Sequence, residues 1–106
     1  MPKYLVEVSY TSEGARGLTA EGGSARRAAV KQSIEQAGGQ LEAFYFALGE
    51  ADAYLIVTHR DNETAAAGAI AVAASGAAKV RTVVLLEPEE IDAAVAQNIA
   101  YSPPGA

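Results

Sequence analysis

The chain has 106 residues, enough for one domain with a single modest core. Half of the residues are hydrophobic and a fifth are charged, a balance typical of a globular protein rather than a disordered one. With no cysteine and one histidine, the chain cannot form disulfides, thiolate metal sites, a cysteine nucleophile or a multi-histidine metal site of its own.

The net charge of −5 argues against a nucleic-acid partner, because neutralising phosphates requires a concentrated basic surface. No apolar run approaches the roughly 20 residues that a membrane-spanning helix needs. The N-terminus carries no visible secretion signal. We therefore expect a cytoplasmic protein that binds neither nucleic acid nor membrane and uses no cofactor.

The first third of the chain predicts a strand followed by helices. Residues Lys3–Tyr10 alternate between two faces, as in a strand. Thr11 or Ser12 can cap a short helical turn that runs to about Leu18. The pair Gly22-Gly23 then predicts a break, since each glycine inside a helix would cost roughly 1 kcal/mol.

The main first helix is expected over residues 25–37. Ser24 is a good N-cap for it, and apolar residues such as Ile34 recur on one face at helical spacing. Gly38-Gly39 ends the helix, because glycine readily adopts the left-handed conformation of a C-terminal cap.

A hairpin is predicted over Gln40–Arg60, with its turn at Gly49–Asp52. A second, alanine-rich helix over about 63–74 follows an N-cap at Asp61 or Asn62. A strand over 79–87 comes next. A third helix then begins at Pro88 and runs to about Asn98, before an extended tail.

This order predicts an α+β fold: a ferredoxin-like βαββαβ sandwich with an antiparallel four-stranded sheet and a C-terminal helix, in one domain over residues 1–106. Two helices can cover only one face of the sheet, yet several strands are apolar on both faces. We expect a second copy of the chain to cover the other face, giving a homodimer or a higher homo-oligomer. The alternative is that the C-terminal helix alone covers it.

Seven short segments spread over nearly the whole chain resemble the GYD-domain family of small bacterial proteins. They are Tyr10–Gly14, Gly22–Arg27, Gly38-Gly39, Phe44–Ala47, Gly49–Asp52, Ala73–Gly76 and Pro103–Ala106. Ala51 departs from the pattern, since it stands where the tyrosine of the name-giving Gly-Tyr-Asp element is expected. The resemblance implies a ferredoxin-like subunit of the dimeric α/β-barrel type that pairs through its sheet, and no settled activity.

Two side chains near the predicted hairpin are candidate catalytic groups. Asp52 closes the turn, where a carboxylate usually accepts turn N–H groups; alternatively it is a base at a pocket mouth. His59 has a pKa near neutrality and can act as a general acid or base; alternatively it lies exposed at the strand end, paired with Asp61. The structural interpretation is favoured for both.

The start of the main first helix is the best candidate for anion binding. Arg26 and Arg27 lie in its first turn, where the helix dipole disfavours cations, so a fixed partner is expected. That partner is either a carboxylate (of Glu21, Asp52 or the C-terminus) or an anionic ligand that also contacts Ser24 and the glycine amides.

Tyrosines on the strands provide the remaining candidates for a site. Packing in the core or at an interface is their favoured role, but a cleft lined by tyrosine and phenylalanine would suit an aromatic or quinone-like ligand. The residues concerned are Tyr4, Tyr10, Tyr45 and Tyr54.

Three functions remain open at this point. The favoured one is a homo-oligomer that binds a small anionic or aromatic molecule between the main first helix and the sheet. The second is a cofactor-independent oxygenase or isomerase that uses tyrosine, Asp52 or His59 around an apolar cleft. The third is a purely structural assembly subunit.

Overall fold

A computed structural model describes all 106 residues and contains eight elements of secondary structure. In chain order they are β1 (Lys3–Tyr10), α1 (Ser12–Glu21), α2 (Gly23–Gln36), β2 (Gln40–Phe46), β3 (Ala53–Thr58), α3 (Asn62–Ser75), β4 (Ala78–Leu85) and α4 (Pro88–Val95). The strands form one sheet in the order β2-β3-β1-β4, and all neighbours are antiparallel. The predicted ferredoxin-like α+β fold is confirmed.

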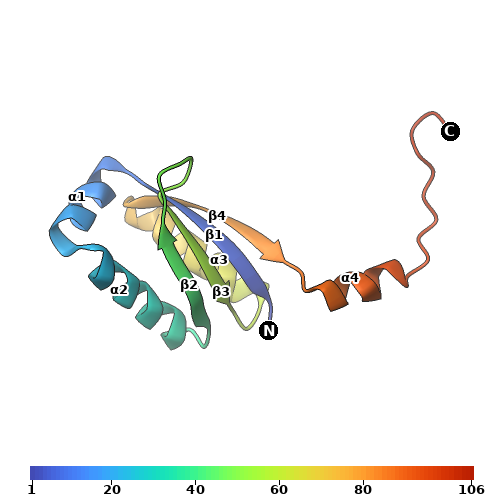
Figure 1. Cartoon of the computed structure of the whole chain (residues 1–106), viewed down its shortest axis with the longest axis horizontal. Coiled ribbons are helices and arrows are strands. Elements are labelled where there is room, and N and C mark those ends of the chain that lie inside the picture. The colour runs from blue at the N-terminus through green and yellow to red at the C-terminus, as the bar shows by residue number, and fades with distance from the viewer.

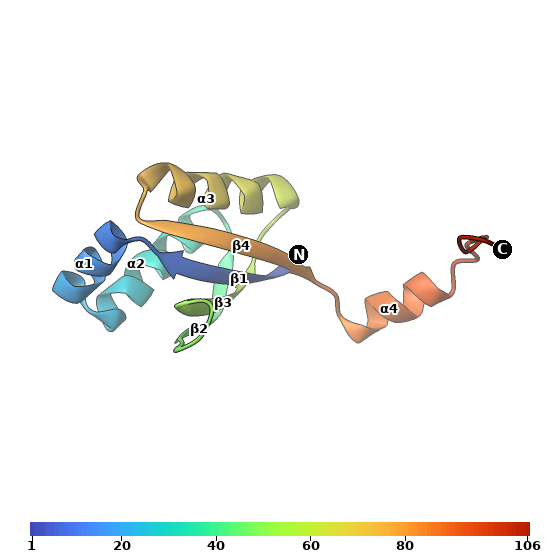
Figure 2. The same cartoon turned by 90° about the horizontal axis from the view of Figure 1, so that it is seen from above.

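The sheet has one covered face and one open face. In Figure 1, α3 lies behind the strands, and Figure 2 shows it on one side of the sheet only. On β3 the side chains alternate accordingly: Ala53, Leu55 and Val57 are buried under the helices, whereas Tyr54 and Ile56 point to the open face and are half-buried.

A bulge in β2 between Leu41 and Ala43 adjusts this alternation. Leu41 packs against the core, while the Glu42 carboxylate lies 3.0 Å from Lys3 Nζ and accepts a hydrogen bond of 2.8 Å from the Thr58 hydroxyl. The bulge thus lets an apolar residue face α2 and the next residue join a polar group on the open face.

The helix starts differ from the sequence prediction in two respects. Helix α1 is a full helix of ten residues rather than a short turn, because Thr11 caps it and it continues until Gly22. Ser24 is not the N-cap of α2: it lies inside the first turn, and Gly22 is the cap. Gly22 has a φ of +89°, so it reverses the chain at once, and its carbonyl accepts the Arg26 N–H at 3.2 Å.

The boundaries of α3, β4 and α4 agree more closely with the sequence prediction. Asp61 caps α3 by accepting the Thr64 N–H at 2.8 Å, and Gly76 ends this helix in the left-handed conformation. Strand β4 ends at Leu85, two residues before the predicted end at Glu87, and α4 ends at Val95 instead of Asn98.

The core is small for a chain of this size. Only ten residues are buried, and the largest cluster is made by Val8, Ala53, Leu55, Val57 and Ala78, with half-buried side chains of α2 and β2 around it. Much of the apolar content must therefore lie at surfaces.

Helix α4 does not cover the open face. It points away from the sheet, as Figures 1 and 2 show, and packs closely against no other element. The radius of gyration is accordingly 17.0 Å, against about 13 Å for a compact domain of this length. The alternative in which this helix alone hides the second face is wrong for the single chain.

Candidate functional site

The mainly apolar hollow of the molecule is a groove between α2 and α3, floored by the covered face of the sheet. Helix α2 packs on β2 and α3 packs on β4, so the two helices stand apart. The hollow measures about 610 Å³, and 18 of its 25 lining residues are hydrophobic. We call it the groove below.

Small side chains on α3 keep the groove open. This wall includes Ala65, Ala67, Ala71 and Gly68, and a Cβ at Gly68 would meet nothing within 4 Å. The floor and the opposite wall carry larger apolar side chains, among them Val6, Leu55, Val57, Val30 and Ile34. A ligand could therefore lie against the sheet without displacing a side chain of α3.

His59 lines one end of the groove and is the most unusual group in it. The residue is only 9% exposed, and Nδ1 is buried without a hydrogen-bond partner. Its ring packs against Tyr4, with centroids 5.5 Å apart, and the Tyr4 hydroxyl donates to Asn62 Oδ1 at 2.5 Å. Burial lowers the pKa of His59, more than the Asp61 carboxylate raises it, so the ring is neutral at pH 7.

The expected exposure of His59 and its pairing with Asp61 are both wrong. The Asp61 carboxylate instead accepts hydrogen bonds from the backbone N–H and the hydroxyl of Thr64, at 2.8 and 2.6 Å. These bonds lower the pKa of Asp61 and hold it at the start of α3.

The other end of the groove holds Arg26 and Tyr10. Arg26 has the partner that its place in the first turn calls for: its Nε lies 3.0 Å from Glu21 Oε2, and Nη2 donates to Oε1 at 3.1 Å. Of the three carboxylates considered from the sequence, Glu21 is therefore the one it meets. Burial raises the pKa of the Tyr10 hydroxyl.

The other predicted anion-site residues lie outside the groove. Ser24 and Arg27 are exposed and do not line it. Asp52 does not line it either: its Oδ2 accepts the Tyr10 N–H at 2.8 Å, and its own N–H donates to the Val8 carbonyl at 2.8 Å. Asp52 thus ties the hairpin to the end of β1.

The predicted tyrosines are divided between the two faces of the sheet. Tyr10 lines the groove, whereas Tyr45 and Tyr54 pair across β2 and β3 on the open face. The structure therefore brings Arg26, Tyr10 and His59 to one groove, together with Thr64 and Ser33, which the sequence reading did not single out. Their signal was weak, because isolated hydroxyl residues on helices are common.

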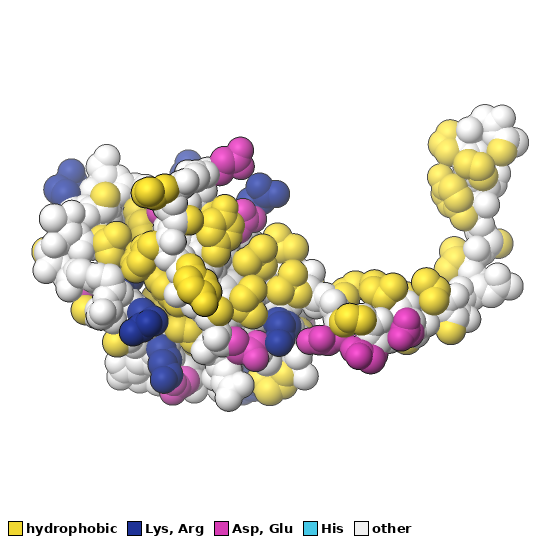
Figure 3. All heavy atoms as spheres, viewed as in Figure 1, with side chains coloured by type: hydrophobic (Ala, Val, Ile, Leu, Met, Phe, Trp, Pro, Cys, Tyr) yellow, Lys and Arg dark blue, Asp and Glu magenta, His cyan; other side chains and the backbone are white.

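The open face carries a continuous apolar row across all four strands, formed by Ala43, Ile56, Leu5 and Val83. Yellow side chains cover this face in Figure 3. A polar group borders the row on one side, where hydrogen bonding and charge raise the pKa of Lys3 and lower that of Glu42. An apolar centre with a polar rim is typical of a protein interface.

Comparison with known families identifies the fold more closely. The model of the GYD domain matches residues 4–95, which is most of the chain. The chain belongs to the GYD domain family. No curated protein and no solved structure matches it.

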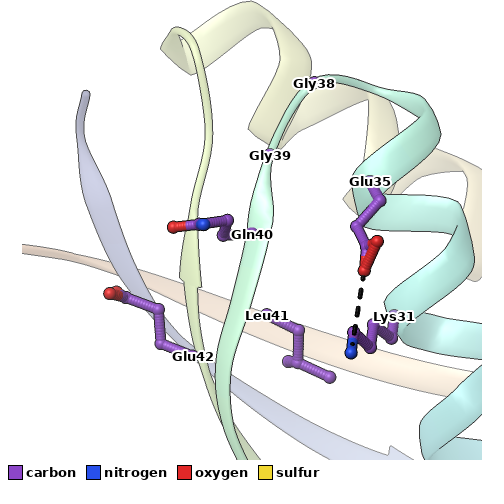
Figure 4. A pocket seen from close by; sticks show the side chains of 7 residues that line it. All are labelled: Lys31, Glu35, Gly38, Gly39, Gln40, Leu41 and Glu42. Carbon is purple, nitrogen blue, oxygen red and sulfur yellow. Dashed lines mark ion pairs between the residues drawn. The ribbon is translucent and has the colours of Figure 1, made fainter.

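In this GYD domain, the position where the name-giving tyrosine was expected is filled by Ala51, which is 4% exposed. A further recess of the GYD domain, drawn in Figure 4, lies beside the Gly38-Gly39 turn and is lined by one hydrophobic residue of seven. The only ion pair between two of its lining residues is the exposed Lys31–Glu35 pair at 3.9 Å, so it offers little to hold a ligand.

The GYD domain has no group of three or more acidic, histidine or cysteine side chains placed to hold a metal ion. None of its helices has the length and apolar character needed to cross a membrane.

Proposed function

We propose that this GYD domain binds one small, mainly apolar molecule in the groove. The size of the groove, about 610 Å³, lies within the range of roughly 300–1,000 Å³ that is usual for ligand sites. Its lining also has the usual character of such a site, with many hydrophobic side chains and few polar groups.

The observation that carries the proposal is the apolar groove itself, which has His59 at one end and Arg26 and Tyr10 at the other. A hydroxyl or carbonyl group of a ligand would bond to a polar side chain at an end of the groove while the rest of the molecule lies along the apolar walls. An aromatic ligand is favoured over an anionic one, because Arg26 already has Glu21 as a partner.

A groove-filling substitution tests this proposal with a matched control. Gly68→Phe places a ring in the groove, where a Cβ meets no atom, and Ala66→Phe adds the same ring on the exposed side of α3. With the fluorescent probe anilinonaphthalene sulfonate, we expect Gly68→Phe to weaken binding about tenfold or more and Ala66→Phe to change it less than about twofold. Equal affinities for both variants and the wild type would refute the proposal and favour a structural subunit.

We further propose that the GYD domain works as a homo-oligomer that pairs through the open face. The chain exposes 7372 Å², whereas a compact monomer of its mass exposes about 5,600 Å². The excess of about 1,800 Å² per chain is in the range that permanent complexes bury. The apolar row of Ala43, Ile56, Leu5 and Val83 supplies the centre of the contact.

One observation supports a second candidate, a cofactor-independent oxygenase or isomerase. The neutral imidazole of His59 beside an apolar groove can take a proton from an acidic C–H or O–H group of a substrate. The test uses the molecule extracted from purified protein and returned to fresh protein. Conversion to a new mass by the wild type, but not by His59→Gln, would support an enzyme; no change with the wild type would exclude this candidate.

A further inference from the structure

Contacts at the start of helix α4 direct the helix away from the sheet. Only Leu86 and Glu87 link it to β4. Glu87 and Glu90 form a capping box, in which the Glu87 N–H donates to Glu90 Oε1 at 2.9 Å, and Pro88 sets the first helical turn. Glu87 Oε1 also lies 3.8 Å from Lys3 Nζ. These contacts fix the direction of the helix, so it does not fold back on its own sheet.

The helix has an apolar stripe that nothing in its own chain covers. Ile91 and Val95 lie one turn apart on it and are 47% and 77% exposed, and Ile99 beyond its end is equally bare. Figure 3 shows hydrophobic atoms along one side of this segment and acidic side chains along the other. A helix of eight residues is marginal in water without tertiary contacts, so the stripe needs a partner surface.

We propose that the C-terminal arm, residues 86–99, docks on a second copy of this chain. The proposal rests on the self-association proposed above and adds to it the segment that holds the partner. A second copy is the fitting occupant because the excess surface of about 1,800 Å² is divided between the open face and the arm, and a symmetric exchange of arms buries both in both copies. The apolar surface is also continuous from Leu85 on the sheet to Leu86 at the root of the arm.

Charge complementarity indicates where the arm lies on the partner. At about 100° per residue, Asp92 borders the stripe of Ile91 and Val95, while Glu89 and Glu90 lie on the far side of α4. The open face carries Lys79 and Arg81 on the half of β4 that is farther from its own arm. The Arg81 side chain is 80% exposed and reaches only Glu7, at 3.8 Å. A second copy packed with reversed strand direction brings Lys79 and Arg81 of its open face to Asp92 beside the stripe.

Single substitutions in the full chain test the arm, with sedimentation velocity to measure the dissociation constant between copies. Ile91→Lys puts a charge in the stripe and should raise this constant about tenfold or more. Asp92→Lys should raise it about threefold or more at low salt, and adding Arg81→Glu should restore it to within about twofold. Glu89→Lys, on the far side of the helix, is the matched control and should leave it unchanged.

These results separate the arm from the pairing on which it rests. Since α4 packs closely on no other element of its own chain, the variants should keep the thermal melting profile of the wild type, which is the check on folding. If Ile91→Lys and Asp92→Lys leave the association of the wild type unaltered, the arm proposal is overturned and pairing through the sheet stands. If the wild type itself stays monomeric at every concentration, both proposals are overturned.

Discussion

His59 combines two properties that rarely occur together at the end of a strand: it is buried, and one ring nitrogen has no partner. The backbone holds it in place, since its N–H donates to the Pro2 carbonyl at 3.0 Å, and Tyr4 packs against the ring. Burying this nitrogen without a hydrogen bond costs about 1–3 kcal/mol of stability.

Burial of His59 also predicts a dependence of stability on pH. Its pKa is lowered in the folded protein, so the unfolded chain binds a proton first as the pH falls through about 6.5. Stability is therefore full above this pH and decreases below it. We expect the melting temperature of the wild type to fall between about pH 7.5 and pH 5.5, and that of His59→Phe to fall much less.

The carboxylates with lowered pKa values do not affect stability in this pH range. The pKa values of Asp61 and Glu42 are lowered by their hydrogen bonds, so their contributions are present at neutral pH and are lost only as the pH falls below about 4.5. An equal fall in melting temperature for the wild type and His59→Phe over the higher pH range would contradict the account of His59.

At the scale of elements, the close approach of α1 to the loop before β4 depends on one glycine. A Cβ at Gly14 would lie 1.9 Å from the Ala77 carbonyl oxygen, to which the Thr11 N–H donates at 3.0 Å. Helix α1 can therefore cap itself and bind the start of β4 only because position 14 has no side chain.

We expect Gly14→Ala to destabilise the protein by about 1–3 kcal/mol, because the helix must move off the loop. Gly17→Ala in the same helix is the control: a Cβ there meets nothing within 4 Å, so the change should stabilise by up to about 1 kcal/mol through helix propensity. Urea denaturation measures both. Two variants with the same midpoint would show that the contact between α1 and the loop is unimportant.

Elements were more predictable from the sequence than the site. Alternation identified β1 and β3, and glycine and aspartate signals identified both ends of α3, because these are local effects. The groove was not predictable in the same way. The alanines of α3 predicted that this helix packs closely against its neighbours, whereas α3 packs on β4 and leaves a hollow toward α2. That outcome depends on the separation of two helices, which no local pattern encodes.

The same limit explains why the surroundings of the candidate residues could be predicted only in part. Alternation already separated Tyr45 from Phe44, and the register now places Tyr45 and Tyr54 on the open face while Tyr10 lines the groove. The burial of His59 was not visible, because it depends on Tyr4, 55 residues earlier, and on the helix that follows. Long-range contacts of this kind have no signature in neighbouring residues.

At the scale of the whole molecule, the single chain leaves much apolar surface exposed. Its radius of gyration of 17.0 Å and its exposed apolar row and arm fit the proposed pairing with a second copy, and the groove fits the proposed small ligand. The two requirements are independent, because the groove lies on the covered face of the sheet and the row on the open face.

Native mass spectrometry of the freshly purified full chain tests the central claim most directly, since it reports the number of subunits and any retained molecule together. The account predicts a dimer or a higher oligomer that carries a bound small molecule, and loss of that molecule, but not of the oligomer, in Gly68→Phe. A monomer without a ligand would contradict it.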